Sequence, residues 1–522
     1  MSAVAVPLSL HTIPETLAFH ALQQPDRPAL LDVNGAVASW ATLARENQRI
    51  ARWLRSRAIG PTDAVLLACP DGLLATTLTL GIATGACVVP VDPDLQSEEA
   101  GRLLDDLGAA ALICVDPAAP VARRAAQLGM PVVAAAIEQD GRIRLAGSLL
   151  AGDGPIIVPN RDADAWLLHT SGTTGRPRRV PCRHRSLLPI RRRMCAEYGI
   201  AADDVAVNVA SVRRTAGLAV LLMALQSGSR TVCAEAYDPL RFPDWLAAFG
   251  ATWFMAVPSV LRDLAERLAA RPGLAASLHL RRVMSAGAPI AGGEQAAIEA
   301  VLGAPVLNVY GMSEATPIAA ERTAAERRSG SVGRPVFDVQ IVDGAGRPVA
   351  PGEAGEVVTR GPHVFAGYRD DPAATATAFT PDGWFRTGDL GCFDADGYLF
   401  LTGREKELIN YGGEKIAPAE VDDALRTHPA VADAAAFPLP HPRLGEIVGA
   451  AIVLRPGADA TPRALRRWLL DRLSSHKAPR QIWIVDALPR TPTGKVRRAD
   501  LTRRFAPGGN AAATAPSRIE HA

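Results

Sequence analysis

Apolar strand-like runs alternate with helix-like runs from about residue 28 to residue 360, and this alternation constrains the fold more than any other feature of the chain. Parallel strands need long crossover connections, which helices usually supply. The pattern therefore predicts an α/β domain with stacked, largely parallel sheets. Its clearest stretch is strand, helix, strand, helix and strand over Ala64–Cys69, Gly72–Thr84, Cys87–Val91, Glu98–Leu107 and Ala111–Val115.

The length of the chain predicts more than one domain, because 522 residues exceed the usual size of one hydrophobic core. Near residue 403 the alternation ends in a hairpin turn, Asp394–Gly397, and a charged connector, Gly403–Glu407. A compact α+β pattern follows. We predict a large N-terminal domain over residues 1–403, a small C-terminal lid over 404–505 and a disordered Ala-, Gly- and Pro-rich tail over 506–522.

The composition is that of a globular protein, with 48% hydrophobic and 21% charged residues. A net charge of +2 predicts neither nucleic-acid binding nor membrane adhesion. The seven cysteines are scattered without a C-x-x-C pair, so we expect no disulfide framework and a cytoplasmic location. Residues 72–91 carry no charge and have the length of a membrane helix, but their glycines and Pro90 favour a core helix followed by a buried strand.

A loop rich in Gly, Ser and Thr, His169–Pro177, follows the apolar run Ala165–Leu168. Glycines let a backbone approach a ligand closely, and hydroxyl and N–H groups then favour an anion. A strand followed by such a loop is a candidate phosphate site, although a polar surface turn is the simpler interpretation. The P-loop pattern G-x-x-x-x-G-K-[ST] is absent from the sequence.

The string Thr-Ser-Gly-Thr-Thr-Gly-x-Pro in this loop resembles the phosphate-binding loop of the adenylate-forming superfamily, which includes acyl-CoA synthetases, peptide-synthetase adenylation domains and firefly luciferases. Four further segments match the same superfamily in the same order, between about residues 30 and 505. The resemblance implies binding of the ATP phosphates by Thr170, Ser171, Gly172, Thr173, Thr174, Gly175 and Arg178.

Two segments resemble the family's adenine and metal sites. In Asn308–Thr316, the resemblance implies that Tyr310 and Gly311 contact adenine, that Ser313 contacts the α-phosphate and that Glu314 binds Mg²⁺. A carboxylate beside a hydroxyl suits this metal, which prefers oxygen ligands. The adenine loop is implied at Gly287, Ala288 and Pro289. A serine-hydrolase elbow, G-x-S-x-G, is the competing interpretation, but Ala315 occupies its fifth position.

The remaining matches lie toward the C-terminus. The resemblance implies that Asp389 and Arg404 bind the ATP ribose, and that Lys406 is the hinge about which the lid rotates. Lys495, in a Pro-, Thr- and Gly-rich loop, is implied as the catalytic lysine that stabilises the negative charge of adenylation. Gly412 and Gly413 are implied to line the pantetheine tunnel for coenzyme A or for the phosphopantetheine of a carrier protein.

The chain departs from the family in two places. Arg178 and Arg179 replace the usual Lys-Gly, within a stretch, residues 176–193, that holds eight arginines. This stretch is interpreted as a solvated basic face or as a binding site for CoA phosphates or an acidic carrier protein. In the acyl pocket, Arg213 and Arg214 stand where many relatives have an aromatic residue and a histidine, before Gly217. We expect a small polar or dicarboxylic acid as the substrate, unless both arginines pair with protein carboxylates.

The sequence as a whole predicts a Mg²⁺- and ATP-dependent carboxylic acid:CoA ligase, most similar to short-acid, oxalate–CoA ligase-like enzymes. One alternative is a stand-alone adenylation enzyme that loads an acyl or peptidyl carrier protein or an amine. Another is a non-catalytic nucleotide-binding scaffold. The presence of Glu314, Asp389 and Lys495 argues against the scaffold.

Overall fold

The structure is a computed structural model. It describes residues 6–7, 9–95, 97–104, 107–146, 157, 159–170, 178–288, 290, 292–412, 414–491 and 495–506. The predicted phosphate loop at residues 171–177, Pro289, Gly413 and residues 507–522 of the predicted tail lie outside these described residues. Contacts divide the chain into unit 1, Met1–Asp338 with Thr359–Phe385, and unit 2, Val339–Val358 with Arg386–Ala522. The lid boundary predicted at residue 404 therefore remains a functional hypothesis.

Sheet A, the larger sheet of unit 1, has nine strands in the described residues. Its central strands pair in parallel, and antiparallel strands occupy both edges. In spatial order the strands are β16 (Arg334–Pro335), β15 (Ala315–Ala320), β14 (Val306–Met312), β13 (Arg282–Ala286), β12 (Trp253–Ala256), β10 (Val205–Asn208), β11 (Arg230–Cys233), β1 (Pro28–Asp32) and β2 (Val37–Ser39).

Sheet B, also in unit 1, has seven strands within the described ranges and the same plan of a parallel centre with antiparallel edges. Its strands run in the order β7 (Ile143–Leu145), β6 (Val132–Ile137), β5 (Ala111–Cys114), β3 (Ala64–Ala68), β4 (Cys87–Val91), β8 (Asp164–Thr170) and β9 (Arg178–Arg183). The central strands β3, β4 and β5 are buried along their whole length, as expected for parallel strands covered on both faces.

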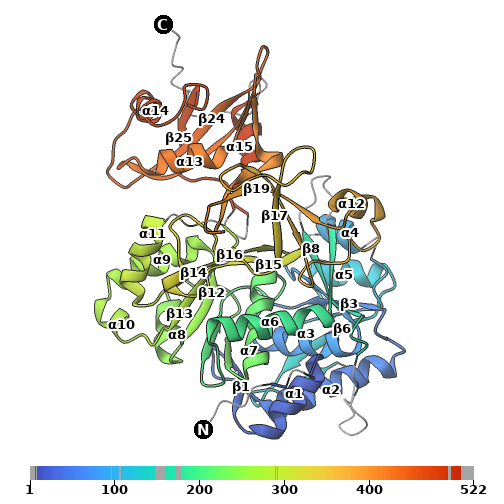
Figure 1. Ribbon diagram of the computed structural model, residues 1–522. Coiled ribbons are helices and arrows are strands. Elements are labelled where there is room, and N and C mark those ends of the chain that lie inside the picture. Colours follow the sequence, from blue (N-terminus) through green and yellow to red (C-terminus); the bar gives the residue numbers. More distant parts are fainter. Residues whose placement is uncertain are drawn as a thin grey trace. The chain divides into compact units, whose positions relative to one another are not determined.

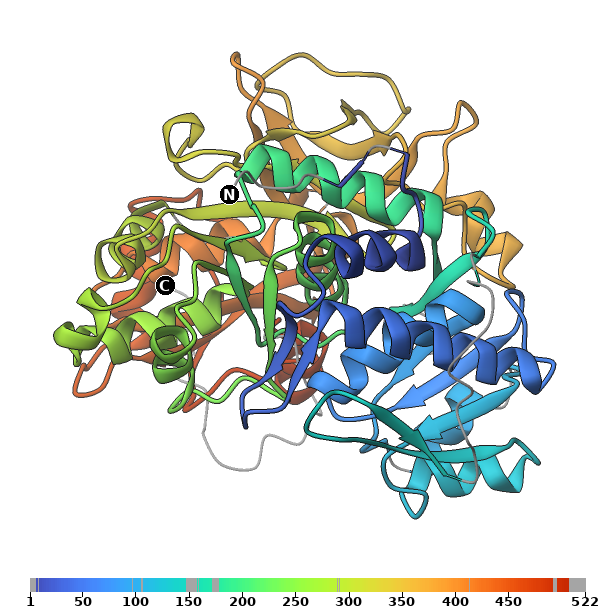
Figure 2. The ribbon, with the colours of Figure 1, turned by 90° about the horizontal axis from the view of Figure 1, so that it is seen from below.

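Helices cover both faces of the two sheets (Figure 1 and Figure 2). One apolar cluster joins strands of both sheets to helices packed between them, a second covers sheet A and a third covers sheet B. The helices of unit 1 are α1 (Ile13–Gln23), α2 (Trp40–Ser56), α3 (Leu73–Gly85), α4 (Ser97–Leu104), α5 (Pro120–Gln127), α6 (His184–Tyr198), α7 (Thr215–Ser227), α8 (Phe242–Ala248), α9 (Pro258–Ala269), α10 (Pro272–Ala276), α11 (Gly292–Leu302), η1 (Ala324–Glu326) and α12 (Pro372–Ala378).

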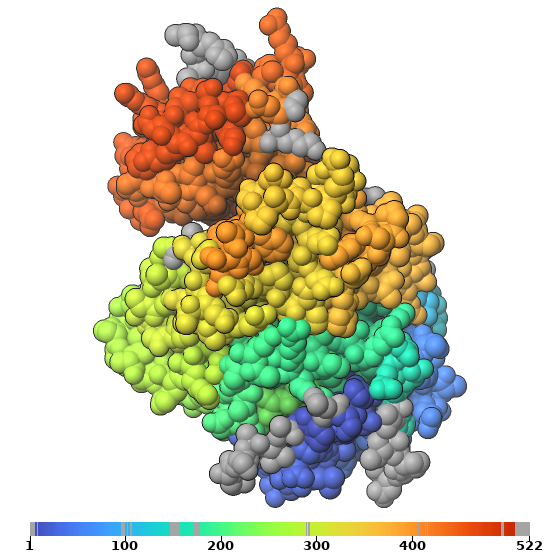
Figure 3. Space-filling view, viewed as in Figure 1, coloured from blue at the N-terminus to red at the C-terminus, as the bar shows by residue number. Residues whose placement is uncertain are grey.

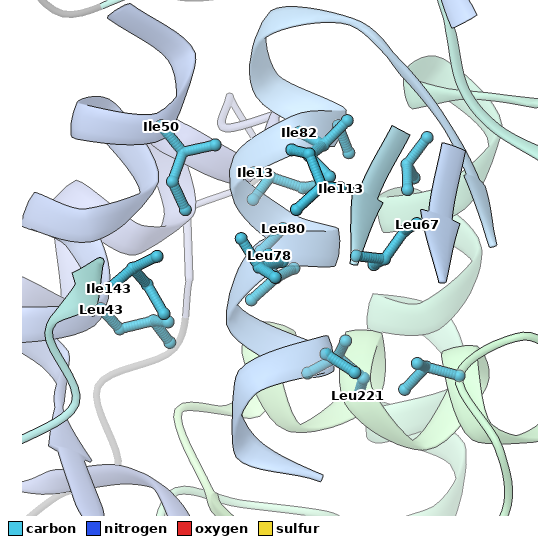
Figure 4. Close-up of a cluster of buried hydrophobic side chains, with 14 of the residues drawn as sticks. Ile13, Leu43, Ile50, Leu67, Leu78, Leu80, Ile82, Ile113, Ile143 and Leu221 are labelled. Carbon is cyan, nitrogen blue, oxygen red and sulfur yellow. The ribbon is translucent and has the colours of Figure 1, made fainter. Parts of the chain in front are cut away.

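Helix α3 is the centre of the first cluster, and every residue of this helix except Leu74 is buried. Its Leu78, Leu80 and Ile82 pack among residues of α2 and of strands β3 and β5, as Figure 4 shows. The uncharged stretch at residues 72–91 is therefore a core helix followed by buried strand β4, as the sequence predicts. No helix in the described part of the chain is long and apolar enough to cross a membrane.

Unit 2 contains most of a four-stranded sheet and a second β-sheet flanked by helices. The four-stranded sheet runs in the order β17 (Asp338–Val342), β18 (Gly355–Arg360), β19 (Phe385–Phe393) and β20 (Leu399–Arg404). The second sheet runs in the order β22 (Glu414–Ile416), β21 (Ile409–Tyr411), β24 (Gly445–Leu454) and β23 (Val431–His441), and β25 (Gln481–Ile484) pairs with β24. The helices are η2 (Glu405–Glu407), α13 (Pro418–Arg426), α14 (Pro462–Leu470) and α15 (Arg498–Phe505).

Local sequence signals in unit 2 match the structure. The predicted turn at Asp394–Gly397 joins the antiparallel pair β19 and β20. The Thr461 hydroxyl caps α14 by accepting a hydrogen bond from the Ala464 amide at 3.2 Å, and Pro462 is the first helical residue. Leu465 and Leu469 face the core of the unit, whereas Trp468 stands half-exposed beneath the Arg472 guanidinium.

Buried histidines make the stability of the fold depend on pH. Among the described residues, burial lowers the pKa of His20, His169, His184 and His363 to about 4 from the usual 6.5. The unfolded chain therefore binds protons near pH 6.5 that the folded chain binds only near pH 4. We expect stability to be fully present above about pH 6.5 and to be lost as the pH falls toward 4.

His20→Gln tests this expectation, since glutamine does not titrate and its amide can donate to the Leu225 carbonyl as His20 does at 2.8 Å. Denaturation between pH 7 and pH 4.5 should show a slope of unfolding free energy against pH that is smaller by about one proton than in the wild type. The exposed His279→Gln is the control and should leave the slope unchanged. Equal slopes in all three proteins would contradict the expectation.

Candidate nucleotide and acyl site

The predicted phosphate loop is anchored by the strands on either side of it. Strand β8 ends at Thr170 and β9 begins at Arg178, and these two residues are paired across the antiparallel ladder. Residues 165–168 of β8 are buried, which fixes the strand in the core. The loop itself, with Ser171, Gly172, Thr173, Thr174 and Gly175, lies outside the described residues, but its two ends are held at one place in sheet B.

The carboxylate of Glu314 is held by a tyrosine that the sequence does not single out. The Tyr368 hydroxyl donates to Glu314 Oε1 at 3.0 Å. Burial raises the pKa of Tyr368 to about 12, so this hydroxyl stays protonated and remains a donor at neutral pH. The guanidinium of Arg178 lies 5.0 Å from the centre of the Tyr368 ring. The structure thus brings Arg178 and Glu314 together through one aromatic side chain.

Ser313 and the acyl-pocket segment are also in contact. Ser313 Oγ and Thr215 Oγ1 share a hydrogen bond at 3.0 Å, and Thr215 is the first residue of α7. Arg214 is the N-cap residue of α7 and is therefore the chain neighbour of Thr215. The Arg214 side chain is exposed and forms no ion pair with a carboxylate of the described residues. Burial, followed by the charges of Arg179 and Arg214, keeps the pKa of His169 low, so His169 is neutral here.

The two pocket arginines have different surroundings. Arg213 Nη2 lies 3.1 Å from Asp71 Oδ2, and Arg213 Nη1 donates to the Cys69 carbonyl at 3.1 Å. Arg213 therefore follows the alternative interpretation, in which it pairs with a protein carboxylate. Gly217 is required for close packing, because a Cβ atom at this position would lie 2.3 Å from the carbonyl oxygens of Ala210 and Ser211.

The predicted adenine contacts lie on neighbouring strands of sheet A. Tyr310 is in β14, and the β13 strand, which pairs with β14 in parallel, leads into Gly287 and Ala288. Gly287 has a positive φ of 90°, a backbone conformation that favours glycine, and both Gly287 and Ala288 are exposed. A side chain at Gly311 would collide with Thr316, so this position also needs glycine. Pro289 lies outside the described residues.

In unit 2, the two predicted ribose contacts are cross-strand neighbours. Asp389 of β19 is paired with Arg404 of β20, and Arg404 Nε lies 2.7 Å from Asp389 Oδ1. The Asp389 carboxylate is buried, whereas Arg404 is about one-third exposed. The hairpin turn after Phe393 brings together these residues, which lie fifteen positions apart in the sequence.

The predicted catalytic lysine lies in a hairpin-like segment of unit 2. The Thr491 amide donates to the Lys495 carbonyl at 2.8 Å, and the Lys495 side chain is exposed. Arg498, three residues later, lies 2.6 Å from Asp422 Oδ2 and 3.3 Å from Glu407 Oε2. This half-buried arginine ties the segment after Lys495 to η2, which contains Lys406.

The predicted pantetheine glycines are described only in part. Gly412 has a φ of 58°, which favours glycine, and its amide donates to the Leu444 carbonyl at 2.8 Å. Gly413 and the side chain of Lys406 are not among the described parts of the structure. The hinge and tunnel roles therefore remain predictions.

The arginine-rich stretch is not a uniform basic face. The segment around α6 reaches the surface, as Figure 3 shows in teal, but most of its arginines have individual partners. Those with a carboxylate within salt-bridge distance are Arg179 with Asp370, Arg183 with Asp164, Arg185 with Asp162 and Arg193 with Glu197. Arg192 donates to Gln226 and to the Leu10 carbonyl, whereas Arg191 is buried. The two interpretations of the stretch, a solvated face or a binding site for CoA phosphates or a carrier protein, remain predictions.

Comparison with known proteins identifies the family. The AMP-binding enzyme family matches residues 17–369, and the C-terminal domain of AMP-binding enzymes matches residues 420–495. The chain belongs to this family. It is 33% identical to a sulfoacetate–CoA ligase of Cupriavidus necator, over 96% of this chain and 99% of that protein. It is 34% identical to an oxalate–CoA ligase of Arabidopsis thaliana, over 92% of this chain and 96% of that protein.

A solved structure supports the same membership. The crystal structure of ATP-bound MatB from Rhodopseudomonas palustris superposes with a TM-score of 0.86 at 28% identity, over 95% of this chain and 99% of that chain. The predicted adenylate-forming superfamily and the predicted α/β fold with a smaller C-terminal domain are thereby confirmed. As a family member the protein is an enzyme that uses an adenine nucleotide.

The residues around Glu314 fit a magnesium ion only together with nucleotide phosphates. No group of three or more His, Cys, Asp or Glu side chains in the described residues is arranged to hold a metal. Mg²⁺ characteristically takes one or two protein carboxylates and completes its coordination with phosphate oxygens and water. Glu314 would supply the carboxylate, and the ion would neutralise phosphate charge when bound.

Sequence analysis missed Tyr368 and Thr215 as parts of this site. Tyr368 lies 54 residues from Glu314 in the chain, and Thr215 lies 98 residues from Ser313. A spacing pattern carries no information across such distances. The one sequence signal for Tyr368 is its position in an aromatic cluster with Phe365, within a Gly- and Pro-containing loop.

Tyr368→Phe should weaken binding of Mg–ATP about tenfold, because a hydrogen bond to a charged group contributes about 1.5–3 kcal/mol. The phenyl ring retains the edge-to-face contact with Phe365, so thermal stability should change little. Titration calorimetry with Mg–ATP measures the effect. Tyr237→Phe removes a similar hydroxyl–carboxylate contact, to Asp263 instead of Glu314, and should leave affinity unchanged. The assignment fails if the two variants bind Mg–ATP equally well.

Proposed function

We propose that this protein is an AMP-forming carboxylic acid:CoA ligase for a small acid that carries a second anionic group. The observation that carries the proposal is full-length similarity to two CoA ligases whose named substrates, sulfoacetate and oxalate, each contain two acidic groups. The residues Glu314, Asp389 and Lys495, which adenylation chemistry needs, are all present.

The first half-reaction is adenylation. A carboxylate oxygen of the acid attacks the α-phosphorus of ATP, the bond to the β-phosphate oxygen breaks, and acyl-AMP and pyrophosphate are formed. In this step Thr170 and Arg178, with the loop between them, bind phosphate oxygens, and Ser313 contacts the α-phosphate. Asp389 and Arg404 bind the ribose. The ammonium group of Lys495 stabilises charge that develops on the attacking and transferring groups.

The second half-reaction is thioester formation. The CoA thiolate attacks the acyl carbon, and the bond between that carbon and the AMP oxygen breaks, so acyl-CoA and AMP are released. Lys406 is the proposed hinge for a change of lid orientation between the half-reactions, and Gly412 with Gly413 is the proposed pantetheine contact. A short backbone segment is sufficient to absorb such a rotation.

Arg214 is the proposed partner of the second anionic group. It is the residue before Thr215, whose hydroxyl is hydrogen-bonded to Ser313. Unlike that of Arg213, its side chain has no protein carboxylate as a partner in the described residues. A guanidinium binds a carboxylate or sulfonate through two parallel N–H groups, which gives both affinity and orientation. A fatty acid offers no group for this contact.

The two alternatives give different results in one assay sequence. Acid-dependent exchange of pyrophosphate into ATP should occur for a ligase and for a stand-alone adenylation enzyme, but not for a scaffold. Subsequent AMP release should depend on CoA for the proposed ligase. If AMP release instead requires a phosphopantetheinylated carrier protein or an amine, that molecule, and not CoA, is the acyl acceptor.

Lys495→Ala should reduce the rate of adenylation by about 10²–10³-fold, the usual cost of losing one preorganised charge contact. ATP binding should be nearly unchanged, and thioester formation from supplied acyl-AMP should suffer much less, because the lysine serves only the first half-reaction. Pyrophosphate exchange and a single-turnover thioester assay measure the two steps. Equal losses in both would contradict the assignment.

Arg214→Leu should change substrate preference rather than general activity. The value of kcat/KM for a small acid with a second anionic group should fall about tenfold or more, since a charge-assisted hydrogen bond contributes about 1.5–3 kcal/mol. A small monocarboxylic acid should be affected much less. The control is Arg347→Leu, which removes an exposed arginine paired with Asp343. An unchanged ranking of acids in Arg214→Leu, or wild-type preference for a long alkyl acid, would refute this role.

A further inference from the structure

Arg191 is a buried cation that the proposed ligase chemistry does not use. It lies in α6, and only 3% of the residue is exposed. Its Nη1 donates to the thioether sulfur of Met194 at 3.1 Å, and its Nε has no hydrogen-bond partner. A thioether is a weak acceptor. In the described part of the chain, this guanidinium therefore lacks the hydrogen bonds that normally accompany a buried arginine.

No carboxylate of the described residues compensates the charge. By contrast, four neighbouring arginines of residues 176–193 do have carboxylate partners. These are Arg179, Arg183, Arg185 and Arg193. The ionisable groups that act on Arg191 are the thiols of Cys182 and Cys195, and burial raises the pKa of each thiol to about 12. Both thiols are neutral at physiological pH. Burial lowers the pKa of Arg191 only to about 10, so the guanidinium keeps its charge.

Arg191 lines a cavity of about 70 Å³ between α6, β9, the start of β15 and residues 363–366, all within unit 1. Figure 1 labels α6 and β15. Among the described residues of the wall, Glu314 is the one carboxylate, and its Oε1 is occupied by the Tyr368 hydroxyl. The wall also contains Cys182, Ser313 and Arg183. The Arg183 Nε makes no hydrogen bond but lies 3.6 Å from Asp164 Oδ1.

We propose that this cavity is a binding site for a small monovalent anion, which pairs with the guanidinium of Arg191. A buried charge without a partner costs several kcal/mol, so a folded protein rarely contains one. An anion in the cavity supplies both the missing charge and the missing acceptors. The inference does not depend on the acyl substrate or on CoA.

The size and charge of the site select the class of ligand. A water molecule needs about 10–15 Å³ of such space, so the cavity has room for a halide, nitrate or formate ion with a few waters. A nucleotide or an acyl chain is far larger. Arg183 and Arg185 also line the wall, but each has an aspartate carboxylate within salt-bridge distance, so Arg191 is the arginine of the described wall without a carboxylate partner. One unbalanced guanidinium favours a monovalent ion over sulfate or phosphate. Because Ser313 and Glu314 belong to the wall, the ion would also support the segment that is proposed to contact ATP.

A bromide experiment locates the ion directly. Crystals of the full-length wild-type protein, grown without chloride and soaked in sodium bromide, should show an anomalous peak within hydrogen-bonding distance of the Arg191 guanidinium. Crystals of Arg191→Met should show none, since methionine fills similar space without a charge. Water-like density without an anomalous peak in the wild type would overturn the proposal. This measurement needs no enzymatic activity.

A stability measurement tests the same site in solution. Replacing sodium gluconate by sodium chloride, nitrate or formate at constant ionic strength should raise the melting temperature of the wild type by about 1–3 °C in a saturable manner. The chloride and formate series separate a halide site from a small-carboxylate site. Gluconate is too large for the cavity and serves as the reference anion.

Variants on the same helix make the test specific. Arg191→Met should lose the anion-dependent shift, and Arg191→Lys should retain a weaker one because it keeps the charge. Arg193→Met removes an exposed arginine paired with Glu197 and should respond to anions as the wild type does. Identical anion responses in Arg191→Met and the wild type would overturn the proposal, and should Arg191→Met not fold, the bromide peak in the wild type decides.

Discussion

The packing of α3 against α2 is the constraint on which the rest of unit 1 depends. A Cβ atom at Gly81 would lie 2.5 Å from Ile50 Cδ1, and one at Gly85 would lie 3.2 Å from the Ala51 Cα atom. The glycines let the two helices approach closely. Asn47 of α2 adds specificity, because its buried amide donates to the Leu80 carbonyl and to the Thr84 hydroxyl, each at 2.9 Å. A misaligned pair would leave these polar groups without partners.

This helix pair fixes the sheets that carry the nucleotide site. Residues of α3 and α2 pack in one cluster with Trp166 of β8, and β8 ends at Thr170, where the proposed phosphate loop begins. The β8–β9 ladder then sets the position of Arg178. The positions of the residues at the start and end of the loop are thus set by the packing of the apolar core and not by the loop sequence. Residues that position a substrate keep a defined geometry only when packed neighbours support them in this way.

The arginines of this chain differ in their burial and in their partners. Arg213 forms an ion pair with Asp71, whereas its neighbour Arg214 has no carboxylate partner in the described residues. Arg404 balances the buried Asp389. Arg191 is only 3% exposed and has no carboxylate partner in the described residues, and this is the reason to infer an anion beside it. Identical side chains thus differ in function because burial and partners differ.

The sequence by itself determined the α/β class, the ordered motifs and local features such as the turn at Asp394–Gly397, because these depend on residues close in the chain. Even the Asp389–Arg404 pair follows from one hairpin. Only the tertiary structure decided that Tyr368 binds Glu314, that Thr215 contacts Ser313 and that Asp71 neutralises Arg213. These contacts join segments far apart in the chain, and their geometry is set by how the helices and sheets pack, which no local pattern encodes.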